Sequence, residues 1–138
     1  MANRLWSGVL IERRLRRLSA GALALARVAA LARSDFSIDL AEAVLRTPAL
    51  TLADAWRELE TAQVLAGSSF VHDLVRDAVE RSVPDDIARH VHGAIALHLE
   101  HGGEEPARMA THWWAAGQWA RAGEQFERAA RRARQAAR

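Results

Sequence analysis

One short segment places a histidine and an aspartate where a strand would end and a helix begin. It spans residues 70–79 and reads FVHDLVRDAV, with two apolar residues before His72 and an apolar helical spacing after Asp73. An imidazole can donate a hydrogen bond to a phosphate oxygen and carries a positive charge when protonated. A carboxylate at a helix start can accept from free N–H groups of the first turn. We therefore expect the strand to deliver His72 to the start of the helix and Asp73 to cap that helix.

The composition excludes most catalytic chemistry from this chain. All 19 basic side chains are arginine, and there is no cysteine. Without lysine there is no Walker-type lysine, Schiff base or lysine general base, and without cysteine no thiolate nucleophile, disulfide or Cys-based zinc site. No phosphate-binding glycine loop, serine–histidine–aspartate arrangement or isolated carboxylate pair is present either. The sequence thus predicts a protein that is not an enzyme, with no catalytic residue.

The histidines raise the question of a metal site. His98 and His101 are three residues apart and would share a helix face, while His90, His92 and His112 lie elsewhere. A metal site needs three or four ligands, and neither a cysteine nor a tight acidic cluster completes one. We expect no metal and no cofactor in this chain.

Residues 1–83 show the pattern of three or four short helices followed by a small hairpin. The expected helices are 5–17, 20–33 capped by Ser19, 38–46 capped by Ser37, and 52–66 opened by a Thr51–Asp54 capping box. Two short strands, 63–66 and 69–72, then flank a Gly67-Ser68 turn. This order predicts a mainly α, winged-helix-like domain over 1–83, with the hairpin as its wing.

Residues 84–138 predict helical hairpins. A long helix, 84–101, should stop at Gly102-Gly103, and two more should cover 105–116 and 119–136. The spacing of Gly117, Trp119, Ala122 and Phe126 resembles the second half of a tetratricopeptide repeat. Trp113 and Trp119 are expected in the core, which leaves Trp114 partly exposed as a candidate partner contact.

Val71-His72-Asp73 resembles the MHD motif of STAND-class signalling ATPases, with valine where the motif has methionine. Together with the repeat-like spacing, the resemblance covers about residues 10–133 and extends to bacterial LuxR-like and antibiotic-regulatory transcription activators. It implies that His72 senses the phosphate of ADP held by an upstream ATPase module, so that ADP or ATP belongs to the longer parent protein. It also implies that an inducer or protein partner binds a helical array that begins near residue 84, in a regulatory fragment.

Two other readings stay open: a DNA-binding winged helix and a plain helical interaction module. The expected reading helix, 52–66, carries Asp54, Glu58 and Glu60 against Arg57 alone, which would repel DNA phosphates. The basic residues 13–17 are the contrary signal. No apolar run reaches the ~20 residues of a membrane span and no signal peptide opens the chain, so we expect a cytoplasmic protein with no membrane contact.

Overall fold

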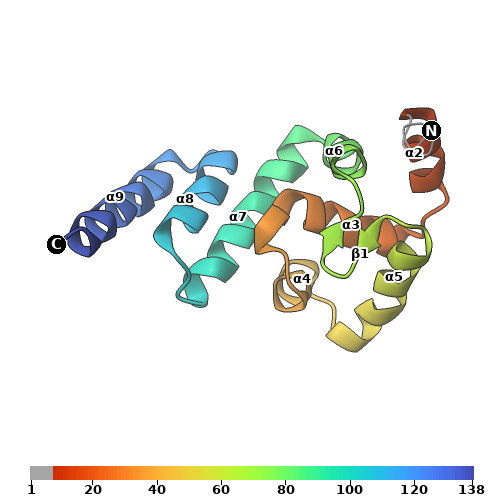
Figure 1. The fold of residues 1–138 in the computed structure, drawn as a ribbon, viewed down its shortest axis with the longest axis horizontal. Helices are drawn as coiled ribbons and strands as arrows, with labels where there is room; N and C mark the ends of the chain where they lie inside the picture. Colours follow the sequence, from red (N-terminus) through yellow and green to blue (C-terminus); the bar gives the residue numbers. More distant parts are fainter. Residues whose placement is uncertain (1–7) are drawn as a thin grey trace. The chain divides into compact units, whose positions relative to one another are not determined.

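The computed structural model describes residues 8–138 and is mainly α-helical. This part of the chain contains eight α-helices, which with the short 3-10 helix make it 76% helical, and one two-stranded antiparallel hairpin (Figure 1). The expected mainly α class with a small hairpin is confirmed. Among these residues no helix is both long and apolar enough to cross a bilayer. The chain divides into two compact units, Met1–Pro84 and Asp85–Arg138, which we describe separately.

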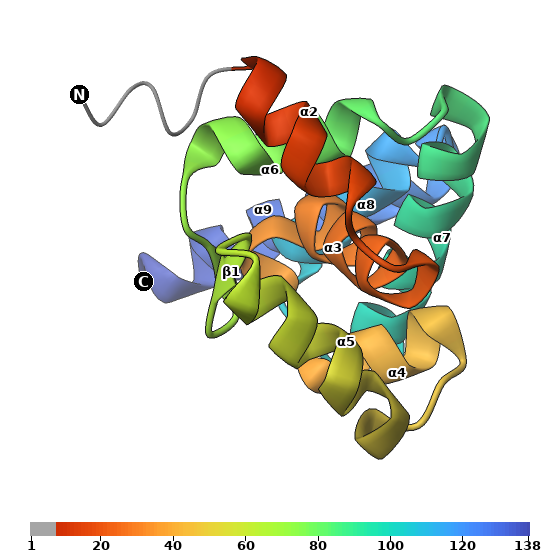
Figure 2. The same ribbon diagram turned by 90° about the vertical axis from the view of Figure 1, so that its right-hand side faces the viewer.

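The first unit is built around one apolar helix, α3. Its elements are α2 (Gly8–Arg16), α3 (Ala20–Ala32), η1 (Arg33–Asp35), α4 (Ile38–Leu45), α5 (Ala49–Thr61), β1 (Leu65–Ala66), β2 (Ser69–Phe70) and α6 (Asp73–Arg81). Helix α3 packs against α4, α5 and α6, and α2 packs against α6 (Figure 2). The expected start of the first helix at residue 5 lies outside the described residues.

Helix α3 is central because nearly all of its faces are apolar. Arg27 is its only charged residue, and eight of its 13 residues are buried. A helix that is apolar on all sides must be covered on all sides, and its many alanines let the neighbouring helices approach closely. Its start is fixed by Ser19, whose hydroxyl oxygen accepts a hydrogen bond from Ala22 N–H at 3.2 Å. The predicted Ser19 cap is confirmed.

The predicted Ser37 cap of α4 is also confirmed, but the expected start of α5 is wrong. Ser37 accepts from Leu40 N–H at 3.1 Å. Helix α5 begins at Ala49 and not after Thr51, which lies inside the helix. The reason is a carboxylate from the preceding helix: Glu42 accepts from Ala49 N–H at 2.8 Å. This long-range bond satisfies a first-turn donor, so the Thr51–Asp54 box is not needed.

Helix α5 also ends earlier than expected, at Thr61 instead of 66. Gln63 adopts a left-handed conformation with φ 59°. Its N–H bonds to Glu60 O at 3.1 Å, and Val64 N–H bonds to Leu59 O at 2.9 Å. This is the Schellman arrangement, in which the left-handed residue is usually glycine, so no residue type marks the helix end here.

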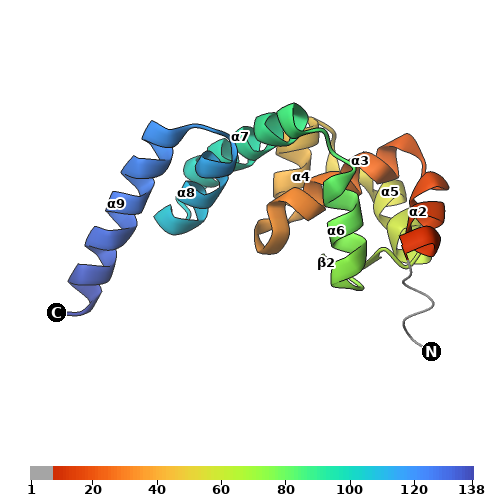
Figure 3. The ribbon, with the colours of Figure 1, turned by 90° about the horizontal axis from the view of Figure 1, so that it is seen from above.

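The hairpin follows directly and is shorter than expected. Leu65 pairs with Phe70 and Ala66 with Ser69, around a turn in which Gly67 has φ +64°. One further bond, Val71 N–H to Val64 O at 3.1 Å, extends the ladder. Trp56 Nε1 donates to Gly67 O at 3.1 Å and ties α5 to this turn. The hairpin therefore leads the chain from α5 to the start of α6 (Figure 3).

The second unit consists of three consecutive helices. They are α7 (Asp85–His101), α8 (Pro106–Ala115) and α9 (Trp119–Ala136), and α8 packs against both others. Gly103 (φ +69°) and Gly117 (φ +77°) end α7 and α8 in the same Schellman arrangement, as expected from the sequence. Ile95, Leu99, Met109, Trp113 and Ala122 are buried between these helices.

Candidate functional site

His72 lies between the hairpin and α6 and caps the helix itself. Its backbone is extended (φ −155°, ψ 142°), and its Nδ1 accepts a hydrogen bond from Leu74 N–H at 3.0 Å. The prediction that Asp73 caps α6 is wrong. Asp73 is the first helical residue, with its side chain 83% exposed, because His72 already occupies the capping position. The carboxylate still favours the positive end of the helix dipole. His72 also lies beyond the end of β2, so the strand does not deliver it directly.

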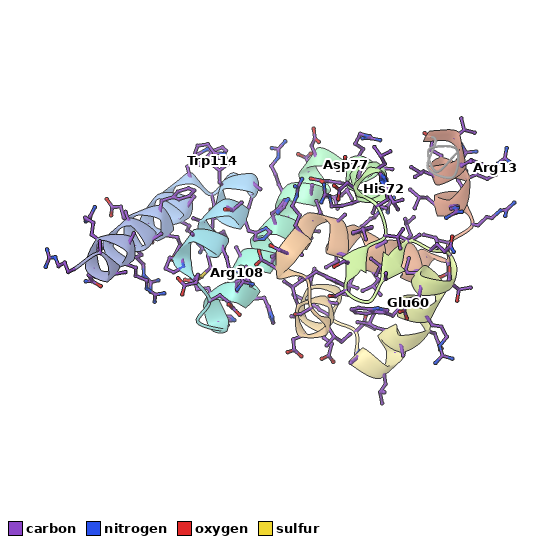
Figure 4. The ribbon with its side chains drawn as sticks, viewed as in Figure 1. Arg13, Glu60, His72, Asp77, Arg108 and Trp114 are labelled. Carbon is purple, nitrogen blue, oxygen red and sulfur yellow. The ribbon has the colours of Figure 1, made fainter. Side chains whose placement is uncertain are left out.

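The capping bond fixes the chemistry of the imidazole. A nitrogen that accepts a hydrogen bond carries no proton, so the ring proton of neutral His72 is on Nε2. Protonation of Nδ1 would remove the acceptor and break the cap. The side chain is exposed, and Figure 4 shows it beside the start of α6.

A cluster of mixed charge surrounds this position. Arg76 lies one turn beyond His72 and contacts Asp73 at 3.4 Å and Asp77 at 3.3 Å. Its side chain is 27% exposed, and its Nε is buried without a hydrogen-bond partner in the described part of the chain. Arg33, at the end of α3, forms an ion pair with Glu80 of α6 at 3.1 Å. Three carboxylates against two guanidinium groups give this cluster a net negative charge.

A small cavity of about 250 Å³ opens beside this cluster. Its lining residues come from α3, the hairpin and α6, and include Arg33, Ser34, Ser69, Asp73 and Arg76. Arg33 has φ 53° and ψ −124°, a conformation that costs free energy for a residue with a side chain. Sequence spacing does not predict this cavity, because its lining residues come from distant parts of the chain, from Ala29 to Arg76.

The surface expected to read DNA is acidic and partly used for folding. On α5, Glu58 accepts from Ser19 N–H and from the Ser19 hydroxyl, both at 2.7 Å. These two hydrogen bonds lower the pKa of Glu58 below its ordinary value of 4.5. Arg57 and Asp54 line an open cavity with Arg14 and Arg17. Arg13 and Glu60 are exposed on α2 and α5 (Figure 4).

The histidines of the second unit form a pair and not a metal site. His92 and His112 bring their Nδ1 atoms to 2.9 Å with the rings 5.2 Å apart, and His112 is 5% exposed. His98 and His101 lie further along α7. Among residues 8–138 no group of three or more metal-binding side chains comes together. A pair from two helices was not expected, since its members are 20 residues apart.

The burial of the three tryptophans in the second unit differs in part from the expectation. Trp113 is buried and Trp114 is 58% exposed, as expected, but Trp119 is 60% exposed and not part of the core. The rings of Trp114 and Trp119 meet edge to face, with centroids 4.7 Å apart. Trp119 opens α9, and the buried residues of that helix are Ala122 and Gln125. Its indole therefore covers Trp114 instead of entering the core.

Comparison with known proteins places this chain in no group. No family model, curated protein or solved structure matches it.

Proposed function

We propose that this chain is a non-catalytic regulatory segment that couples the nucleotide state of an upstream ATPase module to protein contacts made by a helical array. In this proposal the first unit is a winged helix whose hairpin is the wing, and the second unit begins a tetratricopeptide-like array. His72 contacts a phosphate oxygen of ADP bound by the upstream module. The parent protein is a STAND-type signalling ATPase or transcription regulator.

The observation that carries the proposal is the fixed orientation of His72. Its Nδ1 accepts from Leu74 N–H at 3.0 Å, which orients an exposed imidazole at the start of α6. A donor held by a helix start can contact phosphate without losing side-chain freedom on binding. The order of three helices, α3, α4 and α5, followed by a hairpin is the winged-helix order and supports the same assignment.

The switch needs two arrangements with different affinities for nucleotide. A closed arrangement would bind ADP through His72, and a partner bound to the array would favour an open one. The cluster around Arg76 and Arg33 is net negative and does not attract phosphate, so the imidazole would supply the specific contact.

The test separates the capping role of His72 from its nucleotide role. In the parent protein, His72→Ala removes both the cap and the imidazole, whereas His72→Ser keeps a capping side chain and removes only the imidazole. We expect both variants to bind ADP at least about tenfold more weakly, or about 1.4 kcal/mol. Only His72→Ala should also lower the melting temperature. Unchanged ADP affinity in a folded His72→Ser protein, or a parent without a P-loop, would reject the proposal.

A second candidate, an interaction module without any nucleotide link, is favoured by the exposed Trp114–Trp119 pair. It predicts that His72→Ser changes no binding at all, while Trp119→Ala weakens binding of the protein partner.

A further inference from the structure

A cavity of about 500 Å³ lies in the first unit, between α2, α3 and α6. Helix α6 packs on both other helices, and the cavity lies where the three meet (Figure 2). Aliphatic side chains from all three helices line it: Ile11, Leu15, Leu23, Leu74 and Ala78. Cavities of this size with apolar walls and a few charged groups are typical of small-molecule sites. This cavity is therefore a candidate ligand site, and His72 is not among its lining residues.

The cavity also contains a charge that the fold does not explain. Arg27 is the only charged residue of α3, and it is half-buried and lines the cavity. Its guanidinium group donates to Ser82 Oγ at 3.1 Å and to Ser82 O at 3.4 Å, but it pairs with no carboxylate of residues 8–138. Partial burial of a charge costs free energy unless a counter-charge or hydrogen bonds compensate it. An anion in the cavity would supply the counter-charge that the described residues do not.

A second arginine without a carboxylate partner in this part of the chain lines the same cavity. Arg81 is exposed and directly precedes Ser82, to which Arg27 is bonded. The third lining arginine, Arg16, is already balanced by Glu12 at 3.3 Å. Ser82 ends α6, so the negative end of the helix dipole, equivalent to about half a charge, offsets only part of two positive charges. The cavity therefore combines aliphatic walls with a net positive charge.

We propose that this cavity binds a small amphipathic anion, namely a carboxylate with an aliphatic chain of about ten carbons, a size that suits a site of this volume. The carboxylate would accept hydrogen bonds from Arg27 and Arg81, whose guanidinium groups suit carboxylate oxygens. The chain would cover the aliphatic walls. Ser82 holds Arg27 in place before the ligand binds, which lowers the cost of ordering that side chain.

Other small ligands fit the cavity less well. Inorganic phosphate would pair with the arginines but leave the aliphatic walls uncovered. An uncharged hydrocarbon would cover the walls but leave both positive charges without a partner. The amphipathic anion satisfies both features of the cavity.

The anion site is separate from the nucleotide contact proposed for His72, and it goes beyond that function. Its test uses the chain without nucleotide and without an upstream ATPase module. Failure of anion binding would leave the nucleotide switch in place. Unchanged ADP affinity in His72→Ser would in turn leave the anion site in place.

The experiment is isothermal titration of the whole 138-residue chain with decanoate, below the concentration at which decanoate aggregates. Two control ligands separate the two features of the site. Decylamine keeps the chain and reverses the charge, whereas butyrate keeps the carboxylate and shortens the chain. We expect one decanoate per chain and at least about tenfold weaker binding of both controls. Equal binding of either control, or no decanoate binding up to about 1 mM, would overturn the proposal.

Variants of the chain locate the site. Arg27→Gln and Arg81→Gln each remove one charge, and Leu74→Gln places a polar group in the wall. Each should weaken decanoate binding at least about tenfold. Arg81 and Leu74 are exposed, Leu74 by 49%, so their variants keep the test decisive even if Arg27→Gln unfolds. Circular dichroism shows which variants are folded.

The matched controls change the same residue types outside the cavity. Arg13→Gln removes an exposed arginine of α2, and Leu50→Gln changes a leucine that is 90% exposed. Both should bind decanoate normally, and an equal loss in Arg13→Gln would mean general charge attraction and reject the site. Decanoate binding that appears only after Leu5→Ser and Trp6→Ser would also reject it, because residues 1–7 would then be the occupant.

Discussion

The contacts that stabilise the first unit internally differ in kind from those inside the second. In the first unit, polar bonds join residues far apart in sequence: Ser19 with Glu58 across 39 positions, and Arg27 with Ser82 across 55. In the second, polar contacts span at most 27 positions, between Glu105 and Arg132, and each helix packs on its sequence neighbour. The first unit therefore encloses its apolar helix, whereas the second leaves the aromatic side chains of Trp114, Trp119 and Phe126 exposed. An enclosed core suits the first unit, which must hold the side chain of His72 in one orientation. Helices that pack only on their sequence neighbours suit the second unit, which leaves surface available for binding.

The largest loss of stability is expected from a cavity in the core of the first unit. Leu59 of α5 is fully buried, whereas Leu50 of the same helix is 90% exposed. Leu59→Ala should lower the free energy of unfolding by about 2–5 kcal/mol, because it leaves a cavity in the core. Leu50→Ala should change it by less than about 0.5 kcal/mol. Urea unfolding followed by circular dichroism measures both, and equal effects would show that the enclosed core is misassigned.

A smaller loss of stability is expected when the Ser19 cap of α3 is removed. Ser19→Ala deletes the hydroxyl that accepts from Ala22 N–H and donates to Glu58. Loss of a serine cap costs about 1 kcal/mol of stability. Ser37→Ala on α4 removes a cap without a carboxylate partner and serves as the matched control.

The same cap should make stability depend on pH. Hydrogen bonds from Ser19 lower the folded pKa of Glu58 below 4.5, so the ionised carboxylate stabilises the folded state. This contribution is fully present above the unfolded pKa, near 4.5, and is lost as pH falls through the lower folded pKa. Ser19→Ala should therefore flatten the fall in stability below pH 4.5 relative to Ser37→Ala. An unchanged pH profile would show that the Ser19 hydroxyl does not stabilise the ionised Glu58, since the variant keeps the bond from Ser19 N–H.

The smallest changes in stability are expected at the ends of α5 and α8, which share the Schellman arrangement. Gly117 of the second unit and Gln63 of the first both have positive φ, at 77° and 59°. Gly117→Gln should cost about 1 kcal/mol, since side chains disfavour this conformation. Gln63→Gly should gain about 0.5 kcal/mol for the same reason. Thermal unfolding of both variants checks the opposite signs, and two losses would contradict the account.

The sequence predicted the fold where local signals decide it. Ser19 and Ser37 were identified as caps, and Gly117 and Gly103 as helix ends, because each acts on its own helix. The start of α5 was misplaced because Glu42, seven residues away, supplies the first-turn acceptor. Its end was misplaced because a glutamine takes the position that glycine usually marks.

The candidate site was located but not understood from the sequence. His72 was singled out by its neighbours in the chain, yet the cap was assigned to Asp73 because carboxylates cap helices more often than imidazoles. The Arg33–Glu80 pair and the His92–His112 contact depend on tertiary packing and left no local pattern. Trp119 was expected in the core since helical spacing cannot tell a face packed on a neighbour from one left open.

The most direct test of the proposed switch is the ADP affinity of the parent protein with and without the imidazole of His72. Isothermal titration of wild type and His72→Ser compares two proteins that both keep a cap on α6. We predict that His72→Ser binds ADP at least about tenfold more weakly and has an unchanged melting temperature in the absence of nucleotide. Equal affinities in two folded proteins would contradict it and leave His72 as a helix cap.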